Sequence, residues 1–165
     1  MNSKPQFKTP FEIFKQLNII FYAVMGSMFL LLIVALIVQS PERQLDAPSP
    51  NIATEYILVI LIIASISGAY ISYILGTRKV TNKTPLNTKV TMFYKYSLVK
   101  LVLFELAGIL GLIGYFLTAV PLYLAIGFVV IMLMFLHKPA FKRLAVEFKL
   151  TQKEREHITE NKPFR

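Results

Sequence analysis

Two ionisable side chains, Glu105 and Lys100, are the residues of this chain whose type and position are suited to chemistry. Glu105 is the only acidic residue inside any of four long apolar runs, and it lies about eight residues into the third run. At about 1.5 Å per helical residue, that position is roughly 12 Å deep, near the centre of a bilayer. An ionised carboxylate there costs several kcal/mol, so we expect Glu105 to be protonated, paired or turned toward an internal polar cavity.

Two roles for Glu105 stay open. It could transfer protons, or it could be a neutral carboxyl group that hydrogen-bonds to a neighbouring helix, and the second role is favoured because the acid stands alone. Lys100 is five residues away, which is about 140° around a helix, so a direct pair within one helix is not expected. Lys100 is also close enough to the inner interface to snorkel. A partner for Glu105 should therefore come from the first or second run or from another subunit.

The chain has few other side chains that could bind a metal or catalyse a reaction. The chain has no cysteine, which excludes disulfides, thiolate nucleophiles and cysteine-bound metals. Its two histidines, His137 and His157, are too few for a metal cluster or a histidine-based catalytic set. The apolar runs otherwise offer tyrosines and scattered serines. We therefore expect no catalytic residues, no metal and no cofactor, and an enzyme is the least favoured class of function.

The elements that position these residues are four apolar segments. Of the 165 residues, 55% are hydrophobic and 16% are charged, against about a quarter charged in soluble domains. The runs cover residues 19–38, 56–75, 97–118 and 121–136, and a helix needs about 20 apolar residues to cross a bilayer. The sequence predicts an all-α membrane protein with four transmembrane helices arranged as two hairpins, in one bundle over residues 1–138.

The last two runs are nearly fused, and Pro121 separates them. Proline suits the first turn of a new helix, where its missing N–H group does no harm. A tight helical hairpin is therefore predicted at residues 118–121. The first run is longer than the 7–15 apolar residues of a signal peptide, which favours an uncleaved span.

The distribution of lysine and arginine predicts the orientation. Three lysines precede the first run, five basic residues lie in or beside the loop between runs two and three, and eight follow the fourth run. The first loop has only Arg43, against three acids, and the third loop has no charge. By the positive-inside rule both termini and the central loop should be cytoplasmic, in the inner membrane. The net charge of +9 is thus attributed to anionic lipid head groups rather than to nucleic acid.

Small residues predict where helices touch. They recur every four residues in the second run (Ala64, Gly68, Ser72 and Gly76), and a second stripe follows in the third run (Ala107, Gly111, Gly114 and Thr118). Small-xxx-small stripes let helix backbones approach closely in lipid. The pattern leaves open whether the partner helix belongs to this chain or to another.

Both ends of the chain carry amphipathic segments. Thr9, Pro10 and Glu12 have the spacing of a capping box, and residues 9–17 form either a short interfacial helix or a simple extension of the first span. Residues 139–165 are predicted to be a basic amphipathic cytoplasmic tail, whose membrane-surface residues are Phe141, Lys142, Arg143 and Phe148. Its apolar face needs lipid or a partner. A further helix is expected to start at Thr151 and to be solvated.

The nine residues that begin with Glu105, ELAGILGLI, are similar to the carboxylate helix of rotary ATPase c subunits, in which an essential Glu is followed by small residues. Four spans would then resemble the doubled, K-type proteolipid. That family places its hairpin loops in the cytoplasm and its glycines and carboxylate on separate helices. Here the charges place the hairpin loops outside, and one run holds both the glycines and the carboxylate.

A broader resemblance covers most of the chain. The sequence resembles a family of small four-helix integral membrane proteins of Bacteroidota, through residues 17–20 (LNII), the Lys100–Glu105 spacing, residues 114–118 (GYFLT) and the Lys138–Pro139 pair. The family has no assigned activity, so the resemblance implies architecture only.

These observations favour a non-enzymatic structural or accessory subunit of a larger inner-membrane complex, or a homo-oligomer, with anionic lipids as further partners. The loops are too short for a catalytic domain, and the small-residue stripes offer contact surfaces. The alternative is a proton- or ion-coupled transport component that uses Glu105.

Overall fold

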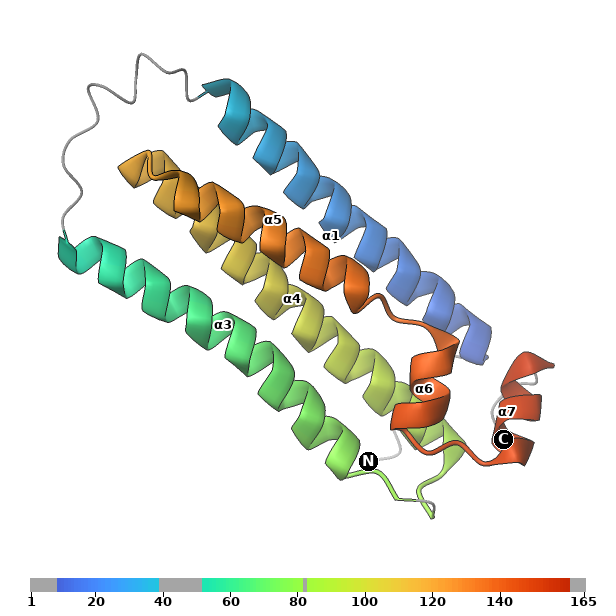
Figure 1. Cartoon of the computed structure of the whole chain (residues 1–165). Helices are drawn as coiled ribbons and strands as arrows, with labels where there is room; N and C mark the ends of the chain where they lie inside the picture. Colours follow the sequence, from blue (N-terminus) through green and yellow to red (C-terminus); the bar gives the residue numbers. More distant parts are fainter. Residues whose placement is uncertain (1–8, 39–51, 82, 161–165) are drawn as a thin grey trace, which may run out of the picture.

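The computed structural model describes residues 9–38, 52–81 and 83–160. Every regular element in these ranges is an α-helix. The helices are α1 (Pro10–Val38), α3 (Ile52–Arg78), α4 (Leu86–Thr118), α5 (Pro121–Leu136), α6 (Phe141–Glu147) and α7 (Gln152–Thr159). Figure 1 shows α1, α3, α4 and α5 running side by side, with α6 and α7 at one end of the bundle. We call this end, where α1 and α4 begin, the basic end.

Three helices, α1, α3 and α4, are each long and apolar enough to cross a membrane. The fourth, α5, has 16 residues, about 24 Å of helix, and meets that test only together with α6, from which it is bent by 76°. The 33 residues of α4 extend over about 50 Å, well beyond a hydrocarbon core of about 30 Å. The excess length of α4 lies at the basic end, because its apolar run begins only near Ser97.

The first helix is continuous from Pro10, so residues 9–17 do not form a separate interfacial helix. The Thr9 hydroxyl accepts a hydrogen bond from the Glu12 amide, and the Glu12 carboxylate accepts one from the Thr9 amide, both at 3.4 Å. This confirms the capping box. No glycine or proline lies between Pro10 and the apolar run that begins at Ile19, and Ile13 and Leu17 are buried, so local sequence and packing both favour one continuous helix over two.

The break between α4 and α5 is a left-handed residue. Ala119 has φ 56°, and its amide donates to the Tyr115 carbonyl at 2.8 Å. The Thr118 hydroxyl donates to the Gly114 carbonyl and accepts from the Val120 amide, which satisfies two backbone groups at the turn. Helix α5 then begins at Pro121, as predicted.

Helix α4 is the centre of the bundle, since it packs against α1, α3 and α5. The small residues of α3 face it in part. Gly76 is buried against the Tyr96 ring, and a β-carbon on Gly68 would touch Leu103 at 3.7 Å. Ser72 is half-buried, whereas Ala64 is exposed and lies outside the contact. Thus the two glycines of this stripe, Gly68 and Gly76, lie in the α3–α4 contact.

The small residues of α4 pack against α5. Ala107 is fully buried, and β-carbons added to Gly111 or Gly114 would meet the backbone or the ring of Tyr123. Both stripes therefore form seams within one chain. The sequence left the partner of each stripe open, and the structure assigns it to a neighbouring helix of the same molecule.

Replacement of Gly114 by alanine should destabilise the hairpin. The new β-carbon would lie 2.5 Å from Cδ1 of Tyr123, whose ring is only 3% exposed and has little room to move. We expect a loss of about 1–3 kcal/mol in the free energy of unfolding, measured by denaturant titration in detergent micelles. Gly26→Ala is the matched control, because no atom lies within 4 Å of its added β-carbon. Equal stability of the two variants would contradict this packing.

Candidate functional site

The C-terminal helices fold back onto the basic end of the bundle. Their apolar side chains form one buried cluster with residues from the starts of α1 and α4 and from the loop after α3. The cluster consists of Ile13, Leu17, Val80, Val90, Phe93, Leu144, Ala145, Phe148, Leu150 and Ile158. The tail is therefore packed against the bundle by its own hydrophobic contacts.

This packing corrects the expectation that the apolar face of residues 139–165 needs lipid or a partner protein. Phe148 is fully buried and meets the Phe93 ring edge-on at 5.6 Å between centroids. Phe141 remains 37% exposed, Lys142 is exposed and Arg143 is half-buried. Sequence periodicity identified the amphipathic helix correctly but could not tell that the bundle itself covers its apolar side.

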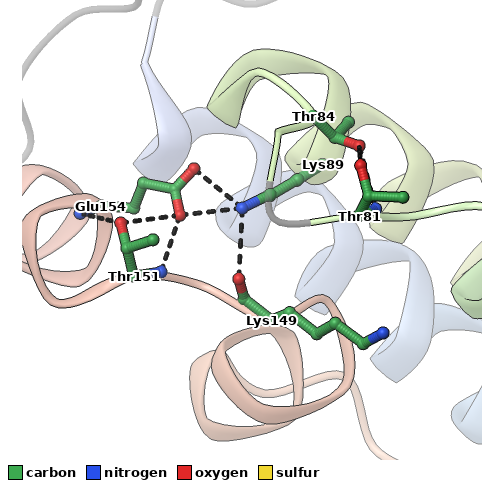
Figure 2. Close-up of polar contacts among 6 residues, drawn as sticks. All are labelled: Thr81, Thr84, Lys89, Lys149, Thr151 and Glu154. Atoms are coloured by element: carbon green, nitrogen blue, oxygen red, sulfur yellow. Dashed lines mark hydrogen bonds and ion pairs between the residues drawn. The ribbon is translucent and has the colours of Figure 1, made fainter.

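An ion pair fastens the last helix to α4. Lys89 Nζ donates to both carboxylate oxygens of Glu154, at 2.9 and 3.0 Å, and to the Lys149 carbonyl at 3.2 Å. Figure 2 shows these bonds together with the capping box, in which the Thr151 hydroxyl accepts from the Glu154 amide and the Glu154 carboxylate accepts from the Thr151 amide. The Lys89 side chain has no exposed surface, and that of Glu154 is 17% exposed. The expected start of α7 at Thr151 is confirmed, but this helix is anchored rather than freely solvated.

The pair also sets the ionisation of Glu154. Burial alone would raise the pKa of this carboxyl, but the hydrogen bonds from Lys89 and Thr151 outweigh it and lower the pKa below its ordinary value. A carboxyl group with a lowered folded-state pKa stabilises the fold above its ordinary pKa. This contribution is lost as the pH falls through the folded-state value.

Lys100 lies in an aromatic cage formed by Tyr70, Tyr73 and Phe104. Its side chain is 7% exposed, and Nζ lies 4.5 Å from the ring centroid of Tyr73, 5.0 Å from that of Tyr70 and 5.9 Å from that of Phe104. These distances are within the range of cation–π attraction. Tyr70 and Tyr73 are on α3, so the cage joins α3 to α4.

A small cavity adjoins this cage. It has a volume of about 20 Å³, and its polar lining comes from Tyr73, Ser97, Lys100, His137 and Arg143. The lining residues come from α1, α3, α4, α5, α6 and the segment that follows α5, so the folded tail forms one wall of the cavity.

Further polar contacts connect the walls of this cavity. The Tyr73 hydroxyl donates to Glu147, whose other oxygen lies 4.0 Å from the guanidinium of Arg143. The Tyr70 hydroxyl and Nε2 of His137 are 3.4 Å apart. The site is thus a polar network of two hydrogen-bonded groups, which meet only at the rings around Lys100.

Glu105 lies apart from this network. It is half-buried in the groove between α1 and α4, and its Oε1 accepts a hydrogen bond from Ser27 of α1 at 3.4 Å. The expectation that its partner comes from another helix is confirmed. Lys100 and Glu105 form no ion pair in the described part of the chain, as their angular separation on the helix predicted.

Sequence reasoning missed Lys89, Glu154 and Ser27. Lys89 was counted only as a loop charge that sets orientation, although it lies inside a helix and is fully buried. The Thr151–Glu154 spacing gave the capping box, but no periodic signal pairs Glu154 with a lysine 65 residues away. Only the folded tail brings the two together.

Replacement of Glu154 by glutamine should release the tail, because the buried Lys89 ammonium loses its counter-charge. We expect a destabilisation of about 3 kcal/mol, seen as faster proteolysis or amide exchange in residues 141–159. The matched control is Glu156→Gln on the exposed side of α7. Adding Lys89→Met to Glu154→Gln should recover part of the loss, and a tail that is equally protected in all variants would contradict the clamp.

Acid should weaken the same clamp. Since the folded-state pKa of Glu154 lies below its ordinary value near 4.5, tail protection should be complete above that pH and fall below it. Amide exchange of α7 measured from pH 6 to pH 3 checks the direction. Glu154→Gln should remove this pH dependence, and a wild-type tail that is protected better at pH 3 than at pH 6 would count against it.

No family model, curated protein or solved structure matches this chain. In the described residues, no group of three or more histidine, cysteine, aspartate or glutamate side chains is placed to hold a metal ion. The function is therefore inferred from the bundle's own polar groups and surfaces.

Proposed function

We propose that this protein is a non-enzymatic accessory subunit of an inner-membrane complex, and that it docks through the groove between α1 and α4 around Ser27 and Glu105. In this proposal the chain crosses the membrane four times with both termini in the cytoplasm. The observation that carries the proposal is an incompletely bonded carboxyl group at the outer surface of the bundle, within its apolar zone.

The few hydrogen bonds to Glu105 indicate that its carboxyl group has a further partner outside this chain. The Ser27 hydroxyl has one hydrogen, and the Val24 carbonyl, at 2.8 Å, competes for it with Glu105 at 3.4 Å. No other hydrogen bond to Glu105 is present among the described residues. A carboxyl group in hydrocarbon needs hydrogen-bond partners, so a polar side chain from a neighbouring transmembrane helix would complete its bonding.

The surroundings of Glu105 suit a helix. Val102 and Leu106, on the same helix, are 56% and 44% exposed. On α1 a β-carbon at Gly26 would meet nothing within 4 Å, so a second backbone can approach closely there. The partner chemistry is thus an apolar helix that presents one donor or acceptor near the middle of the membrane.

Two replacements of Glu105 separate docking from proton-coupled transport, the competing function. Glutamine keeps a donor and an acceptor but cannot exchange a proton, whereas leucine removes both abilities. Docking predicts that Glu105→Gln retains crosslinking to the partner in native membranes. Glu105→Leu should weaken association about 5- to 30-fold, equivalent to about 1–2 kcal/mol for one interhelical hydrogen bond.

The matched control is Ser67→Leu, which removes an exposed polar group from α3 and should leave crosslinking unchanged. Recovery of the wild-type protein only as an uncrosslinked monomer would overturn the proposal. Loss of a proton flux in Glu105→Gln, with crosslinking intact in Glu105→Leu, would instead establish the transport role.

The proposed orientation is testable on the natural background, because the chain has no cysteine. A cysteine in place of Asp46, which lies outside the described residues, should react with a membrane-impermeant maleimide in intact cells. Cysteines in place of Lys83 or Lys153 should react only after the cells are permeabilised. The reverse labelling pattern would show that the orientation is inverted.

A further inference from the structure

The cage at the basic end holds a buried cation without a counter-ion. Among the described residues, no carboxylate oxygen lies within 4.0 Å of Lys100 Nζ, and no hydrogen-bond acceptor contacts it. The three aromatic rings attract the charge, but they do not replace the acceptors that an ammonium group with three N–H donors needs. A lysine that is 7% exposed and lacks acceptors points to a partner that the chain itself does not supply.

The charges around Lys100 do not balance. Arg143 lines the same cavity, and the one carboxylate nearby, Glu147, faces Arg143 at 4.0 Å and accepts the hydrogen bond from Tyr73. Two fixed positive charges thus share one negative charge. A water molecule in the cavity would leave one positive charge without a counter-charge, whereas an anion would neutralise it.

The size of the cavity limits what can enter. A volume of about 20 Å³ holds about one water-sized atom, so it admits a single oxygen and excludes a whole polyatomic anion. The anion must therefore remain at the mouth and insert one oxygen. Arg143 lines the cavity and is one third exposed. Its Nη2 donates to the Leu136 carbonyl and its Nη1 faces Glu147, and the other N–H groups of its guanidinium are left for the remaining oxygens of an oxyanion.

We propose that this cavity binds a phosphate group, with one anionic oxygen on Lys100 and the others at Arg143. The phosphate belongs either to the head group of an anionic phospholipid or to a free phosphate. The lining includes His137 and Pro139, which follow directly on the apolar helix α5, so the site lies at the level where head groups meet hydrocarbon. This inference does not depend on the docking of Glu105.

The test uses the full chain and two probes. The first probe is inorganic phosphate added to protein in a non-ionic detergent. The second is a phosphatidylcholine nanodisc with or without phosphatidylglycerol. At about 100 times the dissociation constant, the bound probe should raise the unfolding temperature by about 5–10 °C. A rise in unfolding temperature when phosphatidylglycerol is added to the nanodisc, with no rise from inorganic phosphate, identifies a lipid phosphate. A rise from inorganic phosphate, with none from phosphatidylglycerol, identifies the free ion.

Matched variants assign the response to the site. Lys100→Met keeps the length of the side chain and removes the charge, and it should abolish the rise. Lys142→Met removes an exposed charge from the same end and should preserve the rise. Arg143→Gln leaves the aromatic cage intact and should reduce the rise in unfolding temperature. It is the test variant if Lys100→Met does not fold. The proposal is overturned if neither probe stabilises the wild type, or if the variant at Lys100 or at Arg143 responds as fully as the wild type.

Discussion

The packing of the bundle depends on one constraint, which is that the backbones of α1, α3 and α5 lie close to α4. This helix contacts α1, α3 and α5, and its small residues make that geometry attainable. Space at Gly111 and Gly114 is filled by Tyr123 of α5, and space at Gly108 is filled by Met28 of α1. In lipid, where apolar surfaces gain little from meeting one another, such van der Waals contact is a main source of helix association. Side chains on these glycines would move two helices outward.

The length of α4 connects the helix bundle to the polar contacts at the basic end. Because α4 continues for several turns beyond its apolar run, its first part projects at the basic end and gives α6 and α7 a surface to pack on. Phe93 and Val90 supply the apolar contacts, and Lys89 supplies the charge that Glu154 neutralises. The tail in turn forms one wall of the cavity beside Lys100. A single long helix thus carries the core, the clamp and the caged cation.

The two intramembrane charges predicted from the sequence have different surroundings. Lys100 turns inward among aromatic rings, whereas Glu105 turns to the groove with α1 and stays half-exposed. Their separation around the helix accounts for this difference. It also separates their proposed roles, since Lys100 lines a cavity and Glu105 lies at an outer surface. A protein with both features can bind a small anion and a neighbouring helix independently.

The sequence by itself predicted the apolar part of each long helix, the break before Pro121 and two capping boxes, because these depend on local properties: run length, the proline at 121 and the Thr–Glu spacing at residues 9–12 and 151–154. It also predicted against a direct Lys100–Glu105 pair within one helix. It did not predict that α4 begins at Leu86. Only the tertiary structure decided that residues 9–17 continue α1, that the stripes face helices of the same chain, and that the apolar side of α6 is covered internally. The reason is physical: periodicity shows which side of a helix is apolar, but whether lipid, a partner or the chain's own helices cover it depends on contacts between residues far apart in sequence.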